Sequence, residues 1–352
     1  KCKLGDACNV FMCKRILATQ TNTEGGVPFY KIRTIGGTPD AYISKELFDD
    51  YKTKYNYPHK GEVMITCAGT VGKCVIYDGK DAYYQDSNIV WIDNPSQYIG
   101  NGFLYHLLAN VDWRKLNSTT IIRIYNDDLR NLKLSYPQIE EQKKISRLLS
   151  LLDERISTQN KIIEDLKKLK SAISDRLFKN IKGDVITLSE ICDIVKGKQI
   201  NGEYLTESGE YYVMNGGTEP SGYYGDYNVD ANTISISEGG NSCGYVQFNT
   251  SPFWSGGHCY SIQNIADHVD NLYLYHYLKS NEEVIMRLRI GSGLPNIQKK
   301  DLTMLKIKVP TFEQQITIST FLSSLERKAD IEERILNVIL KQKLYLLQQM
   351  FI

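Results

Sequence analysis

Apolar residues recur in alternating steps of four and three along two long stretches of the chain. The first stretch runs from Ile145 to Leu177 and the second from Ile318 to Met350. Each stretch follows a proline and then acidic residues, which are favourable at a helix N-terminus. A seam of this period predicts a long helix that packs lengthwise on a partner helix. Some forty residues in such a helix give a rod roughly 60 Å long.

The two stretches are copies of one another. YPQIEEQKKISRLLSLLDERI, which begins at Tyr136, aligns without a gap with VPTFEQQITISTFLSSLERKA, which begins at Val309, at a shift of 173 residues. The sequence before each stretch is also repeated, since KLGDACNVFMCK from Lys3 matches TLSEICDIVKGK from Thr187. Two copies at so long a period indicate a duplicated half-protein rather than a solenoid.

Short β-branched and aromatic runs precede each long helix and are separated by glycine and asparagine turns. They read VPFYKIR, EVMITCAG, GKCVIYDG and SNIVWID in the first half, and EYYVMN, NTISISEGG and YVQF in the second. One shorter helix is predicted in each half, at NGFLYHLLANVDWRKL and at YLYHYLKSN. The sequence therefore predicts an α+β fold with β-rich domains at 1–136 and 183–309 and long helices at 137–182 and 310–352. The helical pattern alone also allows two long core helices inside one compact domain.

Polar residues interrupt both helical seams at the same phases. The seam positions are Leu149, Leu152, Ile156, Gln159, Ile163, Leu166 and Lys170 in the first helix, and Leu322, Leu325, Glu332, Leu336, Ile339 and Lys343 in the second. A parallel pair in matched phase would stack Lys170 on Lys343, two like charges in an apolar seam. We therefore predict an antiparallel coiled coil with a pseudo-twofold axis near Leu166 and Ile339. This register brings Lys170 opposite Glu332 and Gln159 opposite Lys343.

Length, charge and cysteine content limit the class of protein. A chain of 352 residues suits two domains with connections. It contains no apolar run of eighteen residues and no signal-peptide core, which predicts a soluble, cytoplasmic protein without a membrane partner. Its eight cysteines show no C-x-x-C spacing, which predicts reduced thiols and no metal site. The net charge of +1 means that nucleic-acid binding would depend on local clusters.

Two motifs resemble catalytic signatures without their structural context. GNSCG places Ser242 in a G-x-S-x-G pattern, but the following YVQF predicts a hairpin where a nucleophile elbow requires a helix. Around GTVGKC, Cys67 stands where a phosphate-binding loop needs its first glycine, and Cys74 stands where it needs serine or threonine. His106 and His276 lie on apolar helix faces, which favours a packed structural role. The sequence therefore predicts no catalytic residue and no cofactor, and a hydrolase that uses Ser242 is kept only as an alternative to test.

Glycine turns that carry basic or small polar residues recur at matching places in both halves. The candidate DNA-binding residues are Lys14, Arg15, Arg33, Thr34, Thr70 and Lys73 in the first domain, and Lys198, Gln199, Asn215, Thr218, Asn241, Asn296, Gln298, Lys299 and Lys300 in the second. Such side chains pair with base edges and phosphates, although the same residue types are common in ordinary turns. The alternative to a DNA-binding protein is a non-catalytic scaffold with two peptide-binding domains. Binding to duplex DNA that weakens as salt is raised would distinguish a DNA-binding protein from such a scaffold.

Several segments of the sequence resemble segments of the DNA specificity subunits of type I restriction-modification systems. They are GSGLPNIQKKDLTMLKIKVPTFEQQITI, GEVMITCAGTVGKCVIYDG, TISISEGGNSCGYV, PFWSGGHCYSI and YPQIEEQKKISRLLSLLDERI, and the resemblance covers essentially the whole chain. It implies two target-recognition domains, each of which reads one half of a split double-stranded DNA sequence. It further implies that the long helices set the spacing between them and dock two DNA-methyltransferase subunits, with restriction and translocase subunits joining through the complex. By this resemblance the chain is a non-catalytic recognition subunit.

Overall fold

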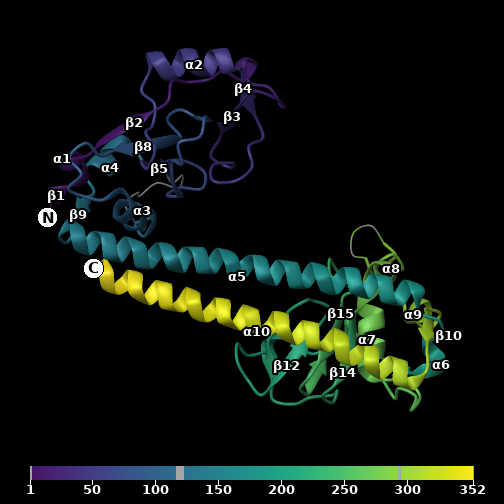
Figure 1. The fold of residues 1–352 in the computed structure, drawn as a ribbon. Coiled ribbons are helices and arrows are strands. Elements are labelled where there is room, and N and C mark those ends of the chain that lie inside the picture. Colours follow the sequence, from purple (N-terminus) through teal and green to yellow (C-terminus); the bar gives the residue numbers. More distant parts are fainter. Residues whose placement is uncertain (1, 116–122, 292, 294, 352) are drawn as a thin grey trace. The chain divides into compact units, whose positions relative to one another are not determined.

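The computed structural model of the protein describes residues 2–115, 123–291, 293 and 295–351 (Figure 1). By its internal contacts the chain divides into two units, of which the first is Lys1–Thr158 with Leu336–Ile352 and the second is Gln159–Ile335. Two long helices, α5 (Ile139–Asn180) and α10 (Phe312–Met350), each contribute residues to both units. Their bounds lie within the two long helices predicted from the sequence.

The first unit is built on a four-stranded antiparallel sheet. Its order is β2 (Asn9–Met12), β8 (Ile89–Asp93), β5 (Val63–Thr66) and β6 (Cys74–Ile76). A three-stranded sheet follows the order β4 (Tyr42–Ile43), β3 (Val27–Tyr30) and β7 (Tyr83–Tyr84), in which β3 and β7 are parallel. A two-residue pair joins β1 (Cys2–Lys3) to β9 (Lys133–Leu134).

The second unit repeats this topology strand for strand. Its four-stranded sheet has the order β11 (Asp193–Lys196), β17 (Cys259–Gln263), β14 (Thr233–Ser237) and β15 (Val246–Asn249). Its three-stranded sheet has the order β13 (Tyr223–Tyr224), β12 (Tyr211–Met214) and β16 (Phe253–Ser255), again with one parallel pair, and β10 (Asp184–Thr187) joins β18 (Lys306–Val309). The duplication seen in the sequence therefore extends to strand order and direction.

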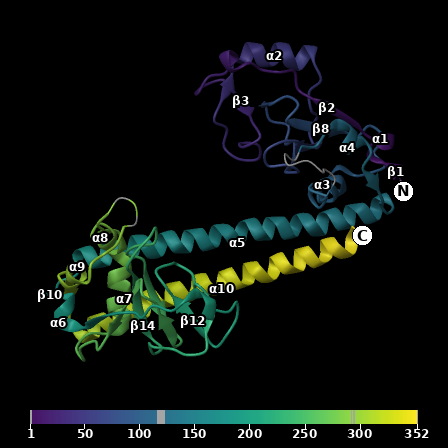
Figure 2. The same cartoon turned by 180° about the vertical axis from the view of Figure 1, so that it is seen from behind.

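Short helices connect the strands of both units (Figure 2). The first unit has α1 (Leu4–Ala7), α2 (Lys45–Lys54), α3 (Asn101–Ala109), α4 (Asn126–Arg130) and a 3-10 turn at Ala18–Gln20. The second unit has α6 (Leu188–Ile191), α7 (Asn271–Ser280), α8 (Glu282–Met286), α9 (Lys299–Thr303) and a 3-10 turn at Gly202–Tyr204. Helix α2 was not predicted from the sequence, and the predicted helix that begins at Asn101 ends earlier than expected.

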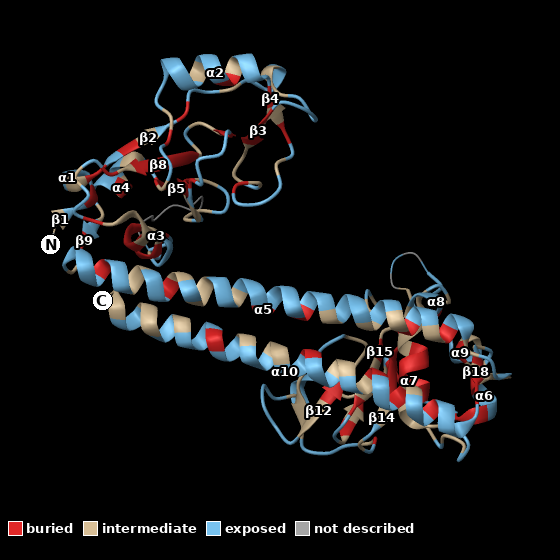
Figure 3. Cartoon of the chain, in the orientation of Figure 1, coloured by how far each residue is buried: buried red, intermediate tan, exposed pale blue. Residues whose placement is uncertain are grey.

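The largest hydrophobic cluster of each unit lies between its four-stranded sheet and one central helix, and a second cluster lies at the three-stranded sheet. Helices α3 and α7 are largely buried (Figure 3). Phe178, near the end of α5, packs edge-on against Tyr277 of α7, and its repeat equivalent Phe351 packs against Phe103 of α3. These aromatic contacts fix one end of each long helix on the globular part of a unit, because apolar burial stabilises the contact.

A buried glutamine fixes the start of each long helix. Gln142 is 1% exposed, and its amide donates to the carbonyl oxygens of Tyr98 and Pro137 while its side-chain oxygen accepts from the N–H of Gly100. Gln315, its repeat equivalent, makes the same three kinds of contact in the second unit, to His268, Pro310 and Asp270. The repeated proline and E-x-Q signature thus encodes the attachment of each helix to its domain.

The predicted seam residues lie on the inner side of the helices, but the predicted partners across the seam are wrong. Each of the thirteen seam positions is buried or half-buried, and Leu149, Leu322 and Ile339 are among the buried ones. In the second unit Lys170 pairs with Glu326 at 2.6 Å, and Glu332 accepts instead from the amide of Gln159. These contacts run in the antiparallel sense within that unit.

Gln159 contacts its own repeat equivalent, Glu332. The predicted pseudo-twofold position near Leu166 and Ile339 is therefore wrong. The predicted contact of Gln159 with Lys343 is replaced in the first unit by an ion pair of Lys343 with Asp153. The long lysine side chains reach half-exposed carboxylates beside the seam. Such a pair loses less hydration energy than one in the centre of the seam.

Each unit also contains a buried polar network beside the long helices. In the second unit Nε2 of His276 lies 2.9 Å from Oγ of Ser323, and the hydroxyl of Tyr275 lies 3.0 Å from Glu326. Burial lowers the pKa of His276 to about 4. In the first unit His106 lies near Ser150 and Asp153, and burial again lowers the histidine pKa. The expected packed role of both histidines is confirmed by their burial.

Candidate nucleic-acid interface

In the first unit, loops from several strands meet at one end of the sheets, here called the first loop end. Met12 pairs with Val90 and Ile65 pairs with Cys74, so the end of β2, the start of β8 and the turn between β5 and β6 share one edge. The parallel pair β3 and β7 also ends here, since Gln85 donates its N–H to the carbonyl oxygen of Tyr30. The candidate residues of this unit all lie in these loops.

The basic candidates at the first loop end differ in the contacts that they make. Lys73 donates from Nζ to the carbonyl oxygen of Ile35 at 2.5 Å, which joins the turn that contains Thr34 to the turn that follows Thr70. Arg15 remains three-quarters exposed, with Nε 3.7 Å from Asp86. Lys14 and Arg33 are likewise exposed. Lys73 is itself exposed, so it joins two loops and, like the other three, presents charge at the surface.

The second unit has an equivalent second loop end. Lys198 and Gln199 follow β11, Asn215 and Thr218 follow β12, and Asn241 lies between β14 and β15. Asn296 joins them through a β-bridge with Gly239, and Gly240 donates its N–H to the carbonyl oxygen of Pro295. The structure thus brings together six of the nine predicted residues of this unit.

The remaining candidates lie beside the second loop end. Gln298 is the N-cap residue of α9, and Lys299 and Lys300 form its first turn. All three are exposed. The N–H of Ile297 donates to the carbonyl oxygen of Glu238 at 2.8 Å, which attaches this segment to the loop end. By the shift of 173 residues, the equivalent positions in the first unit are Tyr125, the N-cap residue of α4, and Asn126 and Asp127 in its first turn.

Equivalent backbone hydrogen bonds hold the two loop ends in the same form. In the first unit Cys67 donates its N–H to Asn88 at 2.8 Å and accepts from Ile124 at 2.9 Å. In the second unit Glu238 donates to His258 at 2.9 Å and accepts from Ile297. The same scaffold thus carries a thiol in one unit and a carboxylate in the other. Burial raises the pKa of Cys67 to about 12, so this thiol is neutral, whereas Glu238 pairs with Lys196 at 2.7 Å.

Sequence reasoning missed several residues of both loop ends. Arg123 in the first unit lies 3.3 Å from the hydroxyl and carbonyl oxygens of Ser87, and its guanidinium lies 5.9 Å from the ring of Tyr125. Glu238 and His258 in the second unit were also missed. Arg123 is the repeat equivalent of the predicted residue Asn296, and this equivalence could have identified it from the sequence. Glu238 has no such signal, since its partners lie far along the chain.

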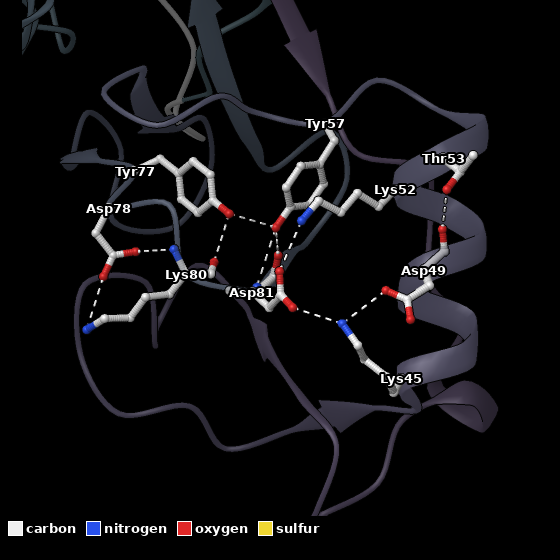
Figure 4. Close-up of polar contacts among 10 residues, drawn as sticks. Lys45, Asp49, Lys52, Thr53, Tyr57, Tyr77, Asp78, Lys80 and Asp81 are labelled. Atoms are coloured by element: carbon white, nitrogen blue, oxygen red, sulfur yellow. Dashed lines mark hydrogen bonds and ion pairs between the residues drawn. The ribbon is translucent and has the colours of Figure 1, made fainter.

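Helix α2 distinguishes the first unit from the second. Asp81 binds both Lys45 at 2.8 Å and Lys52 at 3.0 Å, and Lys45 also pairs with Asp49 (Figure 4). The hydroxyls of Tyr57 and Tyr77 lie 3.0 Å apart beside these groups. Burial, the largest cause, raises the pKa of Tyr57, so the phenol stays protonated. The lysines of α2 are neutralised by aspartates and do not form a basic patch.

The motifs that resemble catalytic signatures lie in turns. Ser242 lies in the turn between the antiparallel strands β14 and β15, where a nucleophile elbow would need a helix. GTVGKC forms the turn between β5 and β6. All eight cysteines are free, and no metal-ligating group of three side chains occurs among the described residues. Within the same part of the chain, no helix is both long and apolar enough to span a membrane.

The repeated topology and the equivalent loop ends define a duplicated protein with two related domains. The family described as "Type I restriction modification DNA specificity domain" matches residues 1–168 and, a second time, 180–341. The chain belongs to this family. The two matches agree with the duplication.

Curated relatives are named as type I restriction specificity subunits. A putative type I restriction enzyme specificity subunit of Haemophilus influenzae is 49% identical over 164 residues, which are 47% of this chain and 42% of that protein. The chain thus aligns with less than half of that relative. A putative type I restriction enzyme MjaX specificity subunit of Methanocaldococcus jannaschii is 23% identical over 91% of this chain and 85% of that protein.

A solved structure shares the fold. The crystal structure of the type I restriction-modification S subunit from M. genitalium covers 99% of this chain and 95% of its own, with a TM-score of 0.75 at 20% identity. A second solved structure, from work on assembly and conformational transition of the type I restriction-modification system, gives a TM-score of 0.57 at 17% identity over 99% of this chain.

Proposed function

We propose that the protein is a DNA-reading subunit in which each β-rich domain reads one half of a bipartite target. The observation that carries this proposal is the duplicated loop end, which presents different side chains on one scaffold. Cys67 corresponds to Glu238, and Asn88 corresponds to His258. A repeated frame with different polar groups suits the reading of two different sequences, because base edges differ in their donors and acceptors.

In this proposal residues 1–136 and 183–309 are the two target-recognition domains, and residues 137–182 and 310–352 are spacer helices. The spacing of the half-sites then depends on the antiparallel packing of α5 on α10. The contacts of Gln142 and Gln315 support this role, because they attach the helices to the domains through buried hydrogen bonds. A fixed spacer is useful on DNA, since sites one helical turn apart are separated by about 34–36 Å.

The outer faces of the long helices provide surface for the proposed methyltransferase subunits. Apolar side chains that do not face the seam are exposed, among them Leu148, Leu151, Ile162, Leu169, Phe321, Ile331, Val338 and Leu344. Exposed apolar surface of this kind is typical of protein interfaces. We propose that two methyltransferase subunits bind there, and that restriction subunits join through the complex. The chain itself contributes recognition and no catalysis.

The test is to co-express the chain with its cognate methyltransferase subunit and map the methylated sites in host DNA. Methylation of one bipartite motif is expected with both subunits, and none with either subunit alone. Methyl transfer by the purified chain without a partner would contradict the proposal, as would a methylated motif that has only one part.

A further inference from the structure

The second unit contains a buried carboxylate with an unused acceptor. The side chain of Glu238 is 9% exposed. Its Oε1 lies 2.7 Å from Nζ of Lys196 and 3.0 Å from the hydroxyl of Tyr260. Burial and this contact raise the pKa of Tyr260, so the phenol remains a donor. Oε2 is buried and has no hydrogen-bond partner among the described residues. A carboxylate accepts at both oxygens, so Oε2 can take a further donor.

The imidazole of His258 extends from this carboxylate to the protein surface. Its Nδ1 lies 3.7 Å from Oε2 of Glu238, and its side chain is 64% exposed. This distance is about 0.8 Å longer than an ordinary N–H···O hydrogen bond. A small rotation of the ring therefore closes the contact. His258 then presents its other ring nitrogen, Nε2, to solvent or to a ligand.

The backbone of His258 is fixed by the neighbouring loops. Its N–H donates to Oδ1 of Asn215 at 3.1 Å, and its carbonyl oxygen accepts from the N–H of Glu238 at 2.9 Å. Gly216 packs behind it in the left-handed conformation, with φ of +87°, where a Cβ would lie 3.1 Å from the Cβ of His258. Since the backbone is held on three sides, the direction of the ring depends on its two side-chain torsions.

Asn296 and His258 flank the same glycine. A Cβ added to Gly239 would lie 4.0 Å from both Nδ1 of His258 and Cβ of Asn296. The predicted residues Asn215 and Asn296 thus converge on a histidine that the sequence did not indicate. This convergence places His258 at the centre of the second loop end.

We propose that His258, held by Glu238, reads one base of the half-site recognised by the second unit, an inference that rests on the proposed function. When Nδ1–H donates to Oε2, Nε2 of the neutral ring becomes a hydrogen-bond acceptor. In the major groove such an acceptor pairs with an exocyclic amino group, which is N6 of adenine or N4 of cytosine. His258 is therefore the contacting residue, and Glu238 is a positioning residue that selects its tautomer.

The test compares methylated motifs of complexes that contain variant chains. His258→Ala should relax the motif at one adenine or cytosine position in one half, with a roughly fivefold to hundredfold loss of discrimination there. The other half and the spacing should stay the same. His268→Ala is the matched control, since His268 is an exposed histidine of the same unit outside the second loop end. It should leave the motif unchanged.

A second pair of variants tests the role of Glu238. Glu238→Ala should relax the same position as His258→Ala, and the double variant should relax it no further. Glu238→Gln keeps one acceptor oxygen, which Lys196 and Tyr260 already use, and turns its amide N–H towards Nδ1 of His258. It should therefore also relax this position, because Nε2 then carries the proton and becomes a donor. An unchanged motif in His258→Ala, or uniformly weaker methylation of all sequences as expected for a phosphate contact, would overturn the inference. A wild-type complex without a bipartite motif would overturn the proposed function as well, which separates the two failures.

Discussion

Gln142 and Gln315 show how single side chains determine where the long helices attach. Both are almost fully buried, and each satisfies a backbone N–H and two backbone carbonyl oxygens of its own unit. Their repetition was visible in the sequence, but their contacts were not, because two of the three partners of each glutamine come from a loop more than forty positions away. A polar residue at a helix start looks the same in sequence whether it is buried or exposed.

Gln142→Ala should lower the free energy of unfolding by about 2–4 kcal/mol, because the N–H of Gly100 and two carbonyl oxygens lose their buried partner. Chemical denaturation of the full chain measures this. Gln138→Ala, at an exposed side chain of the same helix start, is the control and should change stability by under about 0.5 kcal/mol. Equal effects of the two changes would contradict the assigned role of Gln142.

His276 should make stability depend on pH. Its folded pKa is about 4, whereas an unfolded histidine titrates near 6.5. Between these values the unfolded chain binds a proton that the folded chain does not, so stability is complete above about pH 6.5 and falls as the pH approaches 4, by at most about 3 kcal/mol. Unfolding measured from pH 7.5 to 4.5 should show a smaller decline for His276→Gln than for the wild type. Identical declines would contradict this assignment.

At the scale of elements, most strands and the principal helices follow from the sequence. The runs at Val27, Val63 and Thr233 form strands where alternation and β-branching predicted them. The register of the long helices did not follow, because a heptad seam looks the same after a shift of one heptad. The structure selects a register in which Lys170 reaches Glu326 beside the seam, and the anchoring of the helix ends adds a constraint that the seam lacks.

The pair of Lys170 and Glu326 should show a coupling free energy above about 1 kcal/mol in a double-mutant cycle with Lys170→Met and Glu326→Gln. Both side chains are only 21% and 35% exposed, so removal of one partner leaves the other poorly solvated. The exposed pair of Lys168 with Glu164 on α5 is the control, with an expected coupling of about 0.5 kcal/mol or less. Couplings of equal size would refute the importance of the seam pair.

At the scale of the whole molecule, the duplication made it possible to predict the family and the candidate loops from the sequence. It did not reveal the contacts of Glu238 and His258. The loop positions of Asn215, Asn241 and Asn296 were predicted, and the structure brings them to one loop end. Glu238 and His258 were missed because neither belongs to a periodic pattern in the sequence. Their contacts with Lys196 and Asn215 depend on strands that are distant in sequence.

Exchange of residues 183–309 for the matching segment of a relative with a different target tests the central claim most directly. The measurement is the methylated motif of the complex formed by the exchanged chain and the methyltransferase subunit. If each unit reads its own half-site, one half of the motif changes to that of the relative, while the other half and the spacing stay the same. A motif altered in both halves, or in its spacing, would contradict independent reading by two domains on a common helical spacer.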